Sequence, residues 1–114
     1  MGNHLGEFEQ MLLFAIVRLH DEAYGVTIRR EIEERTGRRT SPGAIYTTLE
    51  RLEQRGLVAS HVGGATPERG GRRKRFYRLQ PDGAKALATA WERMQSMAPG
   101  VLPRLEDLAG ESGA

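Results

Sequence analysis

The sequence predicts a mainly α-helical fold with one small β-hairpin. Three observations lead to this class. Apolar residues recur at helical spacing in several segments, glycines and prolines stand at the ends of those segments, and one glycine-rich stretch separates two strand-like runs. The 114 residues are the length of one domain. The hydrophobic share of 39% and the charged share of 28% are those of a soluble, folded protein.

Residues 5–20 are predicted to form the first helix, and it is apolar on two sides. One face carries Phe8, Met11, Leu12, Ala15, Ile16 and Leu19, and the other carries Leu13, Phe14 and Val17. A helix of this kind must be covered on both sides. In so small a domain, a partner subunit is the simplest cover.

A turn over 21–25 leads into a short second helix, 26–36, which Gly37 ends in the usual role of a C-terminal glycine. The second helix is expected to expose Glu31, Glu33 and Glu34 as a solvated face.

Ser41-Pro42 marks the start of the third helix, because serine accepts hydrogen bonds from free backbone N–H groups and proline suits the first helical position. This helix is expected to end at residue 55. Its core face contains Ile45, Leu49 and Leu52. Its outward face contains Gly43, Tyr46, Thr47 and Glu50.

Residues 57–62 and 72–79 are predicted strands, joined by a loop over 63–71 that holds four glycines and a proline. The tip and the returning strand carry five cations: Arg69, Arg72, Arg73, Lys74 and Arg75. Since side chains alternate between the faces of a strand, only one alternating set of the strand cations can face a common partner.

Pro81 begins the last long helix, which extends to about residue 98. Its apolar stripe contains Ala84, Leu87, Trp91 and Met94. Residues 101–108 suggest one more short amphipathic helix. Residues 110–114 are expected to form a disordered tail.

The charge is distributed unevenly. Residues 1–36 carry four Lys/Arg against seven Asp/Glu, residues 37–80 carry ten against three, and residues 81–114 carry three against five. A basic middle segment predicts an anionic partner such as nucleic acid. A solvated basic face without a partner is the alternative.

Several classes of protein and site are disfavoured. The chain has no cysteine, which excludes disulfides, thiolate zinc sites and cysteine nucleophiles. No nucleophile–base–acid set is visible, and the three histidines lack metal-ligand spacing, so we expect no enzyme, no metal and no cofactor. The longest apolar run, 11–17, is too short to span a bilayer, and no secretory signal precedes it. These features predict a cytoplasmic protein without membrane contact.

Two helices separated by a short turn and followed by a hairpin indicate a winged helix-turn-helix. A helix about 10–12 Å across fits the major groove of DNA, and its N-terminus favours a phosphate. We assign residues 1–80 to this DNA-binding domain, with the first helix also in a dimer contact. Residues 81–109 form a C-terminal dimerisation region, followed by the tail over 110–114.

The chain resembles the PadR family of transcriptional regulators. The resemblance rests on AYG at 23–25, SPGAIYTTLERL at 41–52, GLV at 56–58 and GRRKRFYRL at 71–79, followed by Gly83. It covers residues 5–95 and fits the short members with a single C-terminal helix. One departure is Gln80, a poor N-cap, where the family often has threonine.

This resemblance implies a homodimeric repressor. The last and first helices would pack against the partner, and two recognition helices would enter successive major grooves of a palindromic operator. Some members bind flat aromatic compounds in the dimer interface. Trp91 and Met94 are therefore candidate effector-binding residues, with a place in the dimer core as the alternative role for Trp91.

The expected DNA-binding residues lie on the third helix and the hairpin: Ser41, Pro42, Gly43, Tyr46, Thr47, Arg69, Arg72, Arg73, Lys74 and Arg75. Tyr46 is expected to contact a phosphate or a base, or instead to pack against the wing. Thr47 is expected to contact the DNA backbone or a thymine methyl group, or to be simply exposed. Glu50 should lie back from the groove, since it repels phosphate.

The predicted function is that of a homodimeric, sequence-specific DNA-binding transcriptional regulator, with double-stranded DNA, a second copy and a planar aromatic effector as its partners. A winged-helix module for protein–protein contact without DNA binding is one alternative, and the arginine-rich wing argues against it. A small-molecule carrier built around the dimer interface is another.

Overall fold

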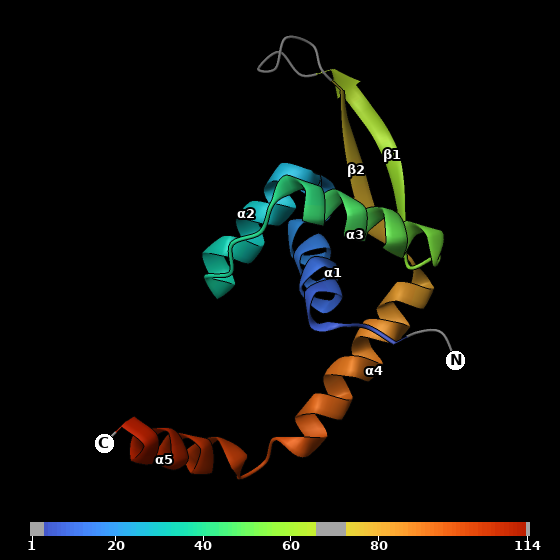
Figure 1. The fold of residues 1–114 in the computed structure, drawn as a ribbon. Helices are drawn as coiled ribbons and strands as arrows, with labels where there is room; N and C mark the ends of the chain where they lie inside the picture. The colour runs from blue at the N-terminus through green and yellow to red at the C-terminus, as the bar shows by residue number, and fades with distance from the viewer. Residues whose placement is uncertain (1–3, 66–72, 114) are drawn as a thin grey trace.

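The computed structural model describes residues 4–65 and 73–113. A mainly helical fold with one antiparallel hairpin is confirmed (Figure 1). The elements are α1 (Glu7–Leu19), a 3-10 turn (His20–Glu22), α2 (Gly25–Thr36), α3 (Pro42–Gln54), β1 (Val58–Ala65), β2 (Arg73–Leu79), α4 (Pro81–Met97) and α5 (Val101–Gly113).

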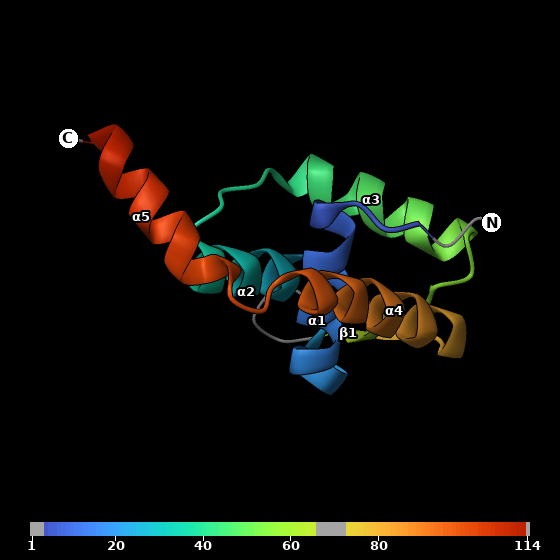
Figure 2. The same ribbon diagram turned by 90° about the horizontal axis from the view of Figure 1, so that it is seen from below.

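The first three helices pack together (Figure 2), and the hairpin projects from them as a wing (Figure 1). The pairing of β1 with β2 places Val58 opposite Leu79 and Ser60 opposite Tyr77, with an irregularity between Val62 and Ala65. The wing is tied to the bundle because the backbone N–H of Tyr77 donates to the carbonyl of Ala23 at 2.8 Å.

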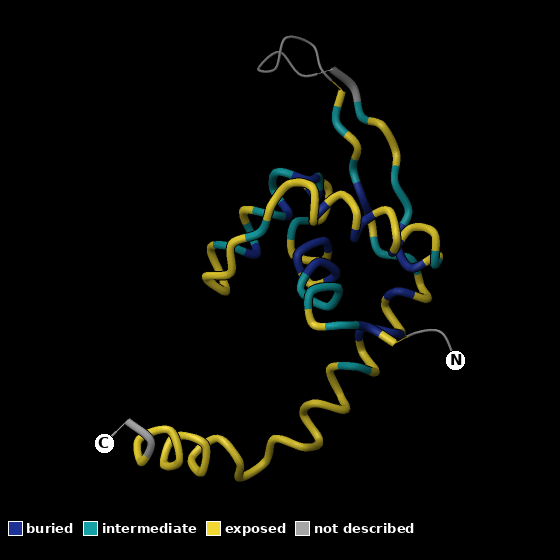
Figure 3. Tube along the Cα trace, viewed as in Figure 1, coloured by how far each residue is buried: buried dark blue, intermediate teal, exposed yellow. Residues whose placement is uncertain are grey.

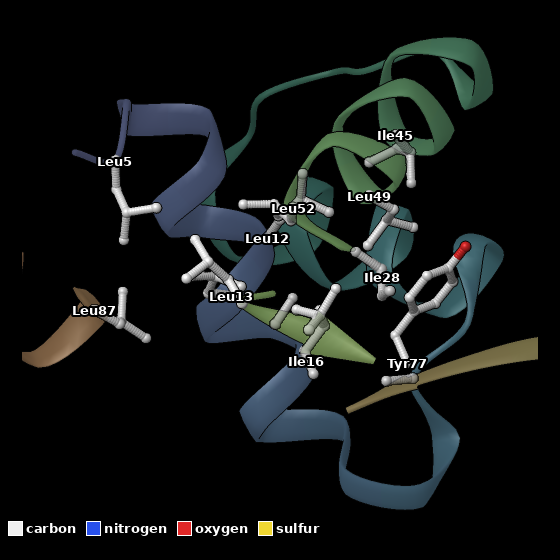
Figure 4. Packing of buried hydrophobic residues seen from close by; sticks show 14 of the residues in the cluster. Leu5, Leu12, Leu13, Ile16, Ile28, Ile45, Leu49, Leu52, Tyr77 and Leu87 are labelled. Atoms are coloured by element: carbon white, nitrogen blue, oxygen red, sulfur yellow. The ribbon is translucent and has the colours of Figure 1, made fainter. Parts of the chain in front are cut away.

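The core lies where α3 crosses α1. Ile45, Leu49 and Leu52 are fully buried, as the helical spacing predicts. They meet buried side chains of α1, among them Leu12, Leu13 and Ile16, together with Ile28 of α2 (Figure 4). Because one face of α3 is buried in this way, the opposite face must point outward.

Local signals at the helix ends act as the sequence predicts. The Ser41 hydroxyl accepts a hydrogen bond from the Ala44 N–H at 3.0 Å, with Pro42 at the first position of α3. Gly37 adopts the left-handed conformation, with φ 74°, and ends α2.

Gly83 marks a close contact between α4 and the connection that follows α3. It is buried, and a Cβ atom there would collide with the backbone carbonyl of Leu57. The same carbonyl accepts a hydrogen bond from the Gln80 N–H at 2.9 Å. The start of α4 is therefore fixed against the bundle.

At Glu31, the structure differs from the solvated face that the sequence predicts for α2. Its carboxylate accepts hydrogen bonds from Arg35 and from Arg18 of α1, the latter at 3.0 Å. The bonds from Arg35 and then Arg18 hold the pKa of Glu31 below its usual value. The reason for the difference is tertiary, since Arg18 lies on another helix.

The distal part of α4 and residues 101–111 of α5 are exposed and extend away from the bundle (Figure 3). The expected tail over 110–114 is wrong for 110–113, which continue α5, while Ala114 lies outside the described residues. A glycine inside a helix costs only about 1 kcal/mol relative to alanine, so Gly110 does not end α5. None of the helices within the described ranges is long and apolar enough to cross a membrane.

Gln80 is the N-cap of α4 and makes no capping bond through its side chain. We expect Gln80→Thr to raise the free energy of unfolding by about 0.5–1 kcal/mol, because the hydroxyl can accept from an unpaired N–H in the first turn. Denaturant unfolding measures the effect. Gln80→Ala is the control and should bring no gain, whereas an unchanged midpoint for the threonine variant would contradict the assignment.

Candidate nucleic-acid interface

The outward face of α3 carries the helix residues singled out from the sequence. Ser41, Pro42, Gly43, Tyr46 and Thr47 are all exposed, as is Glu50. They occupy the side of α3 opposite Ile45, Leu49 and Leu52. Because that core face is buried, the small, hydroxyl-bearing and aromatic side chains of α3 lie on the outside of the molecule.

Tyr46 lies against the start of α2. Gly25, the first residue of α2, is buried, and a Cβ atom on it would collide with the ring and hydroxyl of Tyr46. The ring therefore packs on bare backbone, while 49% of the residue stays exposed. This contact explains why glycine follows Tyr24, a point that the sequence alone did not reveal.

The strand cations divide into two sets. Arg73 and Arg75 are exposed, whereas Lys74 is half-buried on the other face of β2. The Lys74 ammonium lies 4.3 Å from the ring centroid of Tyr24 and donates to its hydroxyl at 3.2 Å. Arg75 donates to the Ser60 hydroxyl at 3.0 Å across the hairpin.

Tyr24 is a residue of this region that the sequence-based site prediction missed. Its ring makes an edge-to-face contact with Phe76, at 5.4 Å between centroids, and Phe76 in turn stacks with His61 at 5.7 Å. Tyr24 also forms an isolated antiparallel bridge with Phe76. The only signal for it was its place in the AYG segment, since its contact Lys74 lies 50 residues away.

These side chains border a groove of about 320 Å³ between the wing and the helices. Its lining, which we call the basic groove, consists of Tyr24, Gly25, Val26, Tyr46, Arg73, Lys74 and Arg75. Three of the seven residues are cationic and none is acidic. The groove also lies at the N-terminus of α2, where free backbone N–H groups favour negative charge. The arrangement suits an anion that carries several acceptor oxygens, such as phosphate.

Tyr77 of β2 is buried in the core and anchors the wing there. Burial is the main cause that raises the pKa of its phenol above the usual value, so Tyr77 stays neutral across the ordinary pH range.

Trp91 and Met94 lie on another part of the molecule, α4, and not beside the basic groove. Trp91 is 49% exposed and Met94 65%. The Trp91 ring meets Phe14 of α1 edge-to-face, with 6.0 Å between centroids.

Arg69 and Arg72 lie outside the described residues. In the part of the chain that the structure describes, no three His, Asp or Glu side chains gather to hold a metal ion.

Two helices joined by a turn, with a hairpin wing beside the second, make this chain a winged helix-turn-helix protein. Residues 13–89 match the transcriptional regulator PadR-like family, and the chain belongs to that family. It is accordingly a transcriptional regulator by family.

One relative supports this assignment, and two solved structures share the fold. The transcriptional regulator Rv3488 of Mycobacterium tuberculosis is 36% identical over 103 residues, which cover 84% of this chain and 92% of that protein. A PadR family transcription regulator from Clostridium difficile R20291 superposes with a TM-score of 0.69 at 23% identity, covering 86% of this chain and 98% of its own. A PadR family regulator from Eggerthella lenta gives 0.65 at 22% identity, covering 88% and 87%. The two solved structures establish the shared fold.

We expect Gly25→Ala to displace Tyr46 with little loss of stability. The added methyl group collides with the mobile end of an exposed side chain, and alanine favours a helix over glycine. Calorimetry should give a melting temperature close to that of the wild type, while affinity for duplex DNA should fall several-fold. If the contact carries the effect, Gly25→Ala combined with Tyr46→Ala should bind DNA no more weakly than Tyr46→Ala alone. An additive loss would contradict this account.

Proposed function

We propose that this protein is a homodimeric, sequence-specific DNA-binding regulator that represses transcription by occupying a palindromic operator. The observation that carries the proposal is the basic groove, which lies directly beside the outward face of α3. Duplex DNA can bind both surfaces. Its regularly spaced phosphates suit the basic groove, and its base edges suit the outward face of α3.

In this proposal α3 enters the major groove with its N-terminus foremost. Ser41, Pro42 and Gly43 approach a phosphate closely, because this turn is exposed and carries little side-chain bulk. Thr47 contacts the DNA backbone or a thymine methyl group. Tyr46 contacts a phosphate while its ring packs against Gly25.

The wing supplies the charge. Arg73 and Arg75 contact the adjacent DNA backbone, since both are exposed and border the groove. Lys74 keeps its bond to Tyr24 and adds positive potential from the side. Arg69 and Arg72, which lie outside the described residues, are proposed from the sequence to contact the same DNA backbone. The three cations border a groove whose lining contains no acidic residue, which favours a polyanion over a protein partner.

A second copy of the chain covers the apolar helices. Of the eleven large hydrophobic side chains exposed among the described residues, nine lie on three helices: Phe14 and Val17 of α1, Trp91, Met94 and Met97 of α4, and Val101, Leu102, Leu105 and Leu108 of α5. We call these nine the apolar face. A twofold axis pairs identical patches, and it would present two copies of α3 to major grooves about 34 Å apart.

We further propose that a planar aromatic molecule releases the protein from its operator. Trp91 and Phe14 already form an aromatic pair on the apolar face, and Met94 is an adaptable neighbour. A twofold axis close to Trp91 would bring two indoles together, which can hold a flat ring by offset stacking. Such a ligand releases DNA only if it prefers one dimer geometry.

We expect Arg73→Ala with Arg75→Ala to weaken binding to all DNA sequences alike. Removing two phosphate contacts should make the slope of log affinity against log salt less steep by about 2. Fluorescence anisotropy at several salt concentrations measures both quantities. Arg78→Ala, on the other face of the same strand, is the matched control and should keep the wild-type slope. An unchanged slope in the double variant would refute the role of the wing.

We expect one dimeric species at low micromolar concentration and no folded monomer. Trp91→Glu places a charge on the apolar face and should shift sedimentation toward the monomer, because an unpaired buried charge costs several kcal/mol. Glu92→Gln, at the adjacent exposed position, should leave the dimer intact. A well-folded wild-type monomer would show that the apolar face has another partner.

Trp91 is the only tryptophan and reports directly on the apolar face. Titration with phenolic acids and planar dyes should quench its fluorescence and release DNA in parallel. If no compound of a broad panel quenches it, and Trp91→Ala lowers stability by about 3–5 kcal/mol as core truncations do, then Trp91 is structural and the effector role fails.

A further inference from the structure

The first turn of α1 receives arginines from the helix-turn-helix unit. Arg38, in the turn between α2 and α3, donates to Glu7 at 3.3 Å. Arg55, at the end of α3, donates to Glu9 at 3.2 Å, and Arg51 lies 3.8 Å from the same oxygen. Two of these three cations therefore reach Glu9 from the recognition helix itself.

Glu9 is much better shielded than Glu7. Its side chain is 15% exposed, against 80% for Glu7. Its second oxygen accepts the Gly6 N–H at 2.9 Å, so both carboxylate oxygens are held in place. Arg55 is fixed as well, because it also donates to the backbone carbonyl of His4 at 2.6 Å. An ion pair ordered on both sides and partly withdrawn from water is weakly screened and keeps its geometry.

This pair supplies something that the apolar core does not. Leu12 and Leu13 of α1 meet Leu49 and Leu52 of α3 through hydrophobic contact, which is not directional. Such contact permits small rotations and shifts of one helix along the other. The hydrogen bond between Glu9 and Arg55 has a preferred direction and length, and it fixes the end of α3 opposite Ser41.

We propose that Glu9 is a positioning residue that sets the orientation of α3 relative to α1, and thereby the distance between the two recognition helices of the dimer. The inference rests on the proposed dimer, in which α1 contributes Phe14 and Val17 to the apolar face. Glu9 lies on the same helix, so it joins the subunit interface to α3 without touching DNA.

The experiment measures that distance directly. Because the chain has no cysteine, Glu50→Cys gives one spin label per subunit on the exposed face of α3. Double electron–electron resonance on the intact protein should show one narrow distance distribution between the two labels. Glu9→Gln, added to this background, should broaden or shift the distribution. Glu7→Gln is the matched control: it makes the same change two residues away at an exposed carboxylate and should leave the distribution narrow.

A second variant keeps the test decisive if Glu9→Gln does not fold. Arg55→Lys retains the charge but loses the planar fork, and it should also broaden the distribution. Two distributions identical to that of the wild type would overturn the inference, whatever happens to the melting temperature. A wild-type protein without any dipolar coupling would instead refute the dimer, and with it the basis of the inference, so the two failures are distinguishable.

Discussion

One face of α3 is buried against α1, and this packing determines where every other part of the α3 surface lies. Ile45, Leu49 and Leu52 have no exposed surface, and burying a leucine or isoleucine side chain contributes about 1.5–3 kcal/mol. A helix held so firmly on one side has its opposite side fixed in space. The position of Ser41 and Tyr46 is therefore a consequence of core packing.

The basic groove follows from two further ties to the same core. The start of α2 is brought under Tyr46 because Gly25 has no side chain, and the wing is drawn in by the contacts of Tyr24 with Phe76 and Lys74. The cations of β2 are thereby separated: Arg73 and Arg75 stay exposed, while Lys74 is held against Tyr24 at the side of the basic groove. The positive charge of the hairpin is therefore concentrated in the basic groove beside α3.

Local chemistry could be predicted from the sequence, whereas contacts between distant segments could not. The cap at Ser41 and the glycine end of α2 are short-range effects of single residues, and both are confirmed. The core face of α3 is confirmed because helical periodicity fixes it. By contrast, the pairing of Lys74 with Tyr24 depends on the fold of the chain between them, since the two residues are 50 positions apart. The continuation of α5 through Gly110 differs from the disordered tail that a chain end predicts, since one glycine costs a helix only about 1 kcal/mol.

We propose that the outward face of α3 and the basic groove together form one DNA-binding surface. Amide chemical shifts of the isotope-labelled protein, followed while a short DNA duplex is added, test it most directly. We expect the largest changes at residues 43–47 and 73–75, with the amides of α5 unaffected. Changes concentrated on α4 and α5, with residues 43–47 undisturbed, would contradict it.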